Sequence, residues 1–139
     1  MKNKLNRLSL PKKQEVIKRL AALTKRQREV VFAYLYGSFI EDVPFHDIDI
    51  GIYVSGIGKV KAGAFTVGFA HRLSKELGFD VDVRVLNFAP VSFVYHVICG
   101  QVFFDRVPEI RTRIIENSIK RYLDLKPVLH WAMKEAFVT

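Results

Sequence analysis

The 139-residue chain has little of several features that mark common protein classes. Cys99 is its only cysteine, so no internal disulfide can form, and this side chain is expected to pack as a small apolar residue. No apolar run reaches the length of a membrane-spanning helix, and no signal peptide is visible at the basic N-terminus. These absences favour a cytoplasmic protein that is not attached to a membrane.

Signature motifs of several enzyme and binding classes are also missing. Residues 63–68 have the glycine spacing of a P-loop, but Phe and Ala follow them instead of Lys and Ser or Thr. Gly56 and Gly58 do not form a dinucleotide-binding fingerprint. His96 and Cys99 are a lone pair, which is more typical of a core than of a zinc site.

Acidic residues are scarce at the start of the chain. Residues 1–28 hold ten Lys or Arg and a single acid, Glu15, whereas the whole chain carries a net charge of +8. The remainder is therefore close to neutral. A basic end attracts anions such as nucleic acid, nucleotides or an acidic partner. A solvated helix face explains the same charges equally well, and no zinc-finger or RNP motif marks a nucleic-acid module.

Hydrophobic residues make up 50% of the chain, enough for a single core, and the length indicates one domain over residues 1–139. Apolar periodicity predicts an α/β (α+β) fold, with a small mixed sheet and helices packed mainly on one face. The predicted elements are a helix in the basic N-terminus 1–28, strands at 30–36 and 47–54, a helix over about 62–77 ended by Gly78, a strand at 79–86, a helix at 89–98, and a strand at 101–104.

The C-terminal segment, residues 107–139, is predicted to be helical. Isoleucines at helical spacing define a long helix that Pro127 should end or kink, because proline cannot donate the helical hydrogen bond. Residues 128–137 then form a last helical piece. Its apolar residues either pack back on the domain or form a partner surface; they are Trp131, Met133, Ala136 and Phe137.

Two aspartates lie on the strand predicted over residues 47–54. Side chains at i and i+2 of a strand point the same way, so Asp47 and Asp49 share one face, while the aliphatic residues between them face the core. Neighbouring carboxylates repel each other unless a positive charge lies between them. Because carboxylate oxygens suit Mg²⁺, the pattern predicts a divalent-metal site.

The order of these motifs carries a family resemblance. Gly37 and Ser38 follow one strand, Asp47 and Asp49 lie on the next, and a further acid follows on a later strand. This set resembles the minimal nucleotidyltransferases (MNT) of the polymerase β superfamily over roughly residues 30–121. The resemblance implies the nucleotidyltransferase fold.

The third carboxylate of the family pattern is Asp82 or Asp80. The family often shows an Asp, a few apolar or mixed residues, Leu-Asn and then a Pro. The stretch from Asp82 to Asn87, followed by Pro90, matches this pattern, so the resemblance favours Asp82. Alternatively, both acids pair with Arg84 or a neighbouring Lys, as charges on strands commonly do.

The resemblance implies an enzyme that transfers a nucleoside monophosphate, first of all AMP from ATP, to an acceptor hydroxyl. Two Mg²⁺ ions are expected, one activating the nucleophile and one binding the triphosphate. Asp47 and Asp49 would bridge both ions, and Asp82 would hold the nucleophile-side ion. Gly37 would let the triphosphate approach the backbone, and Ser38 would bind its β- and γ-phosphates.

The loop after the Gly-Ser pair departs from the family pattern. Eight residues separate Ser38 from Asp47, which is fewer than usual, and the frequent Arg is replaced by Phe39. Glu41 and Asp42 add two acids to the same loop. Such a site should hold a triphosphate less tightly, unless basic groups from the N-terminal helix or a partner compensate.

Minimal members of this family commonly act beside HEPN-domain ribonuclease toxins, as antitoxins that adenylylate the partner. The resemblance therefore implies a protein adenylyltransferase with a HEPN-type partner. Two alternatives remain: a degenerate, non-catalytic antitoxin, which the short acidic loop favours, and a nucleic-acid-binding module that uses the basic N-terminus. The sequence also leaves open whether the chain forms a homo-oligomer.

Overall fold

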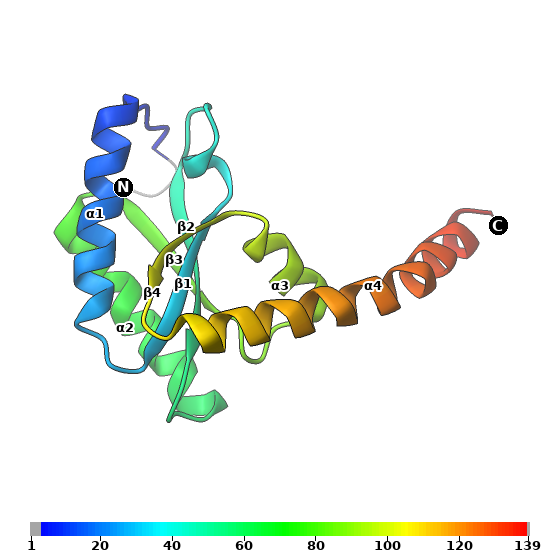
Figure 1. The fold of residues 1–139 in the computed structure, drawn as a ribbon. Helices are drawn as coiled ribbons and strands as arrows, with labels where there is room; N and C mark the ends of the chain where they lie inside the picture. The colour runs from blue at the N-terminus through cyan, green and yellow to red at the C-terminus, as the bar shows by residue number, and fades with distance from the viewer. Residues whose placement is uncertain (1–3, 139) are drawn as a thin grey trace.

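The computed structural model describes the backbone of residues 4–138 and the side chains of residues 4–136. Predictions for the first three residues and for the Phe137 side chain lie outside that range. Within it the chain forms four α-helices, one 3-10 turn and four strands (Figure 1). In chain order they are α1 (Leu10–Lys25), β1 (Val30–Tyr36), η1 (Ser38–Ile40), β2 (Asp47–Val54), α2 (Lys59–Leu77), β3 (Asp80–Val85), α3 (Val91–Ile98), β4 (Gln101–Asp105) and α4 (Pro108–Val138).

The four strands form one mixed sheet in the order β3-β2-β1-β4. β1 is antiparallel to both β2 and β4, whereas β2 and β3 run parallel. The parallel pair requires a crossover connection, and α2 supplies it. All seven residues of β1 are buried, as its continuous apolar run predicted for a central strand. The mixed sheet is confirmed.

Helices α1 and α2 pack on one face of the sheet. The aliphatic residues that alternate with the acids of β2 and β3 point to this face and join side chains such as Leu20 of α1 and Phe69 and Leu73 of α2 in one core. Burying a large apolar side chain of this kind contributes about 1.5–3 kcal/mol. The alternation read from the sequence therefore fixes which face of β2 carries its acids.

Helices α3 and α4 pack on the opposite face. Val94 and Val97 of α3 contact the buried Tyr34 and Tyr36 of β1, and the first turns of α4 pack beside them. The α/β class is confirmed, and the helices are shared between both faces instead of lying mainly on one. Helices lie on both faces because the side chains of β1 are apolar or aromatic on both faces, and both must be buried against other elements.

Helix α4 is the longest element, with 31 residues, and it continues through Pro127. The prediction that this proline could end the helix is wrong. The second half of α4 projects away from the rest of the chain (Figure 1). Trp131 and Met133 are 63% and 62% exposed there, so this half does not pack back on the domain. None of the helices described is both long and apolar enough to cross a membrane.

The basic N-terminal segment is tied to the loop that follows the Gly-Ser pair. The backbones of Asn6 and Phe45 exchange two hydrogen bonds, of 2.8 and 3.0 Å. The Lys13 ammonium of α1 donates to the Glu41 carbonyl at 2.9 Å and lies over the Phe39 ring, 5.4 Å from its centroid. A cation from α1 therefore reaches the loop in which the sequence shows no arginine.

Candidate active site

Four aspartates share one face of the sheet. In the parallel register, Asp47 of β2 is paired with Asp80 of β3, and Asp49 with Asp82. Residues at matched positions of paired strands point to the same side. Because the residues between these acids face α1 and α2, all four carboxylates lie on the opposite face. The predicted grouping of Asp47, Asp49 and Asp82 on one face is present.

The Gly-Ser pair lies directly beside the second aspartate. Tyr36, the last residue of β1, is paired with Asp49 across the sheet, and Gly37 follows it. A Cβ added to Gly37 would lie only 2.6 Å from the Asp49 Oδ2 atom. Ser38 opens the turn η1, and its carbonyl accepts the Glu41 N–H at 3.1 Å. Only glycine allows the Asp49 carboxylate to sit against this backbone.

Negative charge is concentrated around Asp49, which is half-buried. Burial, followed by the negative charges of Asp82 and Asp47, raises the pKa of its carboxyl to about 6. Arg84 and His96 act in the opposite direction on the same pKa. The site therefore carries more negative charge than its neighbours compensate, which is the condition that a bound cation relieves.

An aromatic wall that sequence reasoning missed borders the acids. The Tyr36 ring meets Phe93 and His96 of α3 edge-on, with centroids 5.8 and 5.7 Å apart. Burial, followed by the charges of Asp49 and Asp82, raises the pKa of the Tyr36 hydroxyl to about 12, so it stays neutral. Tyr36 adjoins the Gly-Ser pair in sequence, whereas the place of α3 depends on the tertiary fold.

The third carboxylate already has a partner. The Arg84 Nε atom donates to the Asp82 Oδ2 atom at 3.2 Å, as the alternative interpretation of these charges anticipated for one of the two acids. Among the described side chains, no three from His, Cys, Asp and Glu are arranged to hold a metal ion. The chemistry and register of the carboxylates nevertheless fit a hard cation such as Mg²⁺, since all are oxygen donors on one face.

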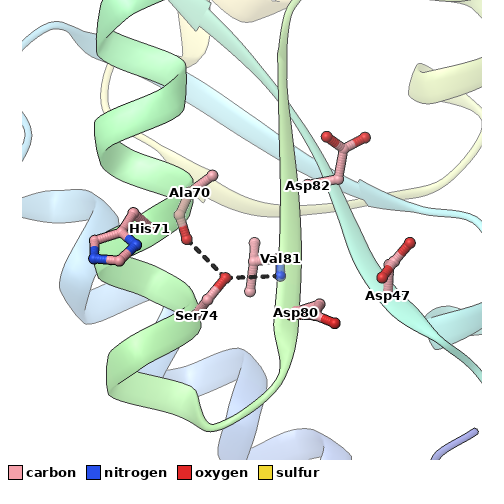
Figure 2. Close-up of a pocket in the computed structure, with 7 residues that line it drawn as sticks. All are labelled: Asp47, Ala70, His71, Ser74, Asp80, Val81 and Asp82. Atoms are coloured by element: carbon pink, nitrogen blue, oxygen red, sulfur yellow. Dashed lines mark hydrogen bonds between the residues drawn. The ribbon is translucent and has the colours of Figure 1, made fainter. Parts of the chain in front are cut away.

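A cavity of about 510 Å³ lies along the outer edge of β3, and its lining includes Asp47, Asp80 and Asp82 but neither Asp49 nor the Gly-Ser pair (Figure 2). On the far side of β3, the Ser74 hydroxyl accepts the Val81 N–H at 3.0 Å and donates to the Ala70 carbonyl at 2.8 Å. This serine thereby satisfies a backbone group on the outer edge of β3. The cavity is lined by Asp47, Asp80, Val81 and Asp82 of the strands and by Ala70, His71 and Ser74 of α2.

A comparison with protein families identifies the family of this chain. The profile described as Polymerase beta, Nucleotidyltransferase covers residues 18–109, which is more than half of the chain. The chain belongs to the polymerase β nucleotidyltransferase family. This nucleotidyltransferase domain match includes β1, the Gly-Ser pair, all four aspartates and α3. A comparison with curated protein sequences found no significant match.

Solved structures share the fold of this nucleotidyltransferase. A chain of a complex between a tri-AMPylated Shewanella oneidensis HEPN toxin and an MNT antitoxin matches with 18% identity and a TM-score of 0.72, over 91% of this chain and 99% of that one. A chain of the toxin-antitoxin MntA-HepT matches with 18% identity and a TM-score of 0.70, over 90% and 99%. A chain of a toxin-antitoxin structure with AMP-PNP matches with 17% identity and a TM-score of 0.73, over 88% of this chain and 98% of that one.

We expect Asp49→Asn to stabilise this nucleotidyltransferase at neutral pH. The folded-state pKa of Asp49 lies above its unfolded value of 3.8, so the ionised carboxylate destabilises the fold fully above about pH 6 and not at all below about pH 4. After allowance for solvent screening, the gain in unfolding free energy should be about 1–2 kcal/mol. Urea unfolding at pH 4, 6 and 8 measures it.

The control for this pH dependence is Asp42→Asn, which neutralises an exposed aspartate of the loop. It should change the unfolding free energy little at any of the three pH values. A wild type that is as stable as Asp49→Asn at pH 8 would contradict the charge distribution described for the site.

Proposed function

We propose that this chain is a Mg²⁺-dependent nucleotidyltransferase that transfers AMP from ATP, or another nucleoside monophosphate, to an acceptor hydroxyl. The observation that carries the proposal is the junction of three segments. The Gly37-Ser38 turn adjoins Asp49, which is in turn register-paired with Asp82. A phosphate-binding turn next to a surplus of carboxylates suits a triphosphate that arrives with divalent cations.

Each residue has a distinct proposed role. Asp47 and Asp49 would hold the cations that accompany the triphosphate, and Asp82 would hold the nucleophile-side ion. When bound, the ions would activate the acceptor hydroxyl and stabilise the leaving pyrophosphate. Gly37 leaves the turn open at the backbone, and the Ser38 hydroxyl donates a hydrogen bond to the β- or γ-phosphate.

The position of Lys13 supports an active site over a degenerate one. The loop after the Gly-Ser pair has no arginine, and Phe39 in its place is fully buried. The ammonium of Lys13 reaches this loop from α1 instead. Lys13 thus offsets part of the negative charge of the acidic loop, which supports an active site over a non-catalytic antitoxin.

The acceptor that we propose is a hydroxyl on a HEPN-type toxin. Structural matches along nearly the whole chain come from toxin-antitoxin complexes, one of which contains a tri-AMPylated HEPN toxin. The chain would then act as the antitoxin of a pair, by adenylylating its partner. A purified HEPN-domain protein encoded beside this chain is the acceptor to assay, with transfer of labelled AMP as the readout.

Calorimetry with Mn²⁺ and a non-hydrolysable ATP analogue tests the site itself. Wild type should bind the pair, and the Asp47→Asn/Asp49→Asn double variant should lose at least about tenfold in affinity, since charge-assisted contacts are worth about 1.5–3 kcal/mol each. The matched control is Glu41→Gln/Asp42→Asn, which removes the same charge from the loop and should bind as tightly as wild type or more tightly. Equal heats from wild type and the aspartate double variant would exclude this site.

A further inference from the structure

Arg84 is the cation closest to the third carboxylate. It lies two residues after Asp82 on β3, so both side chains are on the same face of the sheet. Its Nε atom is 3.2 Å from the Asp82 Oδ2 atom, and its guanidinium lies over the Phe93 ring of α3, 5.9 Å from the centroid. The arginine therefore touches both the acid and the aromatic wall.

The Asp82 oxygen that faces Arg84 is the kind of donor that a metal ion needs. An oxygen that accepts a guanidinium N–H gives up part of its lone-pair density, and a divalent ion placed beside the guanidinium is repelled by it. Metal and arginine thus compete for one carboxylate.

We propose that Arg84 is an internal counter-ion that holds Asp82 while the site is empty and must leave it before the nucleophile-side metal binds. The proposal rests on the proposed function, which gives Asp82 to that metal. Arg84 is then a positioning residue, because it acts on the reaction only through Asp82. It offsets part of the negative charge of the adjacent carboxylates while no metal is bound.

The contact is suited to reversible release. The side chains of Arg84 and Asp82 are 61% and 45% exposed, and an exposed ion pair biases an equilibrium by no more than about fivefold. The Phe93 ring offers a cation–π contact that the Arg84 guanidinium can keep after it leaves the carboxylate. The arginine therefore sets the metal concentration at which the site fills, without blocking it.

The test is a titration of Mn²⁺ alone, with no nucleotide and no acceptor, followed by electron paramagnetic resonance of the free ion. Arg84→Gln should bind Mn²⁺ about two- to fivefold more tightly than wild type, because both competition and repulsion are removed. Arg84→Lys, which retains the charge, should stay near wild type. In an Asp82→Asn background, Arg84→Gln should give a clearly smaller gain, because only the repulsion remains to be removed.

Arg72→Gln is the matched control. Arg72 also makes one side-chain hydrogen bond, to Gln27 at 3.2 Å, and lies over a phenylalanine, Phe69, at 5.8 Å, but it is on α2 away from the acids. Its substitution removes the same charge and should leave Mn²⁺ affinity unchanged. Thermal unfolding of each variant verifies that the fold is intact.

The outcomes separate this inference from the proposed function. Equal or weaker Mn²⁺ binding by Arg84→Gln, or an undiminished gain without the Asp82 carboxylate, would overturn the role of Arg84. So would a chain that binds no Mn²⁺ in any variant. If Mn²⁺ binding depends on Arg84 as described while no nucleotide is transferred to any acceptor, only the proposed function fails.

Discussion

Asp82→Asn should abolish nucleotide transfer, whereas Asp80→Asn should leave it nearly unchanged. The two acids are two residues apart on the same face of β3, but they face different partners. Asp82 is register-paired with Asp49, which adjoins the Gly-Ser turn, and Asp80 is paired with Asp47, one step nearer the start of both strands. We therefore expect a metal centre next to the triphosphate to use Asp82.

The expected loss for Asp82→Asn is at least about a hundredfold in transfer rate, a size typical of removing an electrostatic group that acts on the transition state. Its nucleotide affinity should fall much less, because the nucleophile-side ion acts mainly after binding. Release of pyrophosphate and transfer of labelled AMP, both with Mg²⁺ present, measure the rate. The reverse pattern, with Asp80→Asn inactive and Asp82→Asn active, would move the third carboxylate by two residues.

Gly37→Ala should destroy metal and nucleotide binding even though it adds one methyl group. That methyl would lie 2.6 Å from the Asp49 Oδ2 atom, so the carboxylate would have to move away from the turn proposed to bind phosphate. The backbone at Gly37, with φ of 81° and ψ of −161°, is also in a region almost restricted to glycine. We expect a loss of about 1–3 kcal/mol in stability and at least about tenfold in binding of Mn²⁺ with the ATP analogue.

Gly56→Ala is the control for this substitution. Gly56 also has a positive φ, of 79°, but an added Cβ would meet nothing within 4 Å. Both variants should therefore lose stability from backbone strain, and only Gly37→Ala should lose binding. If calorimetry finds the same affinity in both variants, the contact between Gly37 and Asp49 is not what shapes the site.

Local patterns in the sequence predicted much of the site. The alternation of β2 and β3 placed the acids on one face because the period of two is a property of each strand alone. Gly78 ended α2 as expected, with a φ of 77°. In the stretch that identified Asp82, Asn87 accepts the Val54 N–H at 2.9 Å and donates to the Val54 carbonyl at 2.7 Å. This amide therefore joins the end of β2 to the chain that leaves β3.

Other parts of the site depend on contacts between distant segments. Nothing in the sequence of α3 indicates that Phe93 and His96 border the acids, because that placement follows from the packing of α3 on β1. The contact of Lys13 with the loop likewise joins residues 28 positions apart. Pro127 shows the opposite error, because a local rule predicted a break in α4 that does not occur. This half of α4 is exposed, so the backbone carbonyl that loses its hydrogen bond to the proline remains accessible to water.

Trp131 is the only tryptophan of the chain, and it lies 63% exposed on the projecting half of α4. Indole emission depends on local polarity, so its fluorescence reports on the surroundings of that helix. The carboxylates lie on strands of the sheet, far along the chain from this residue. The protein thus contains an intrinsic optical probe of its outer helix, which can be observed separately from events at the aspartates.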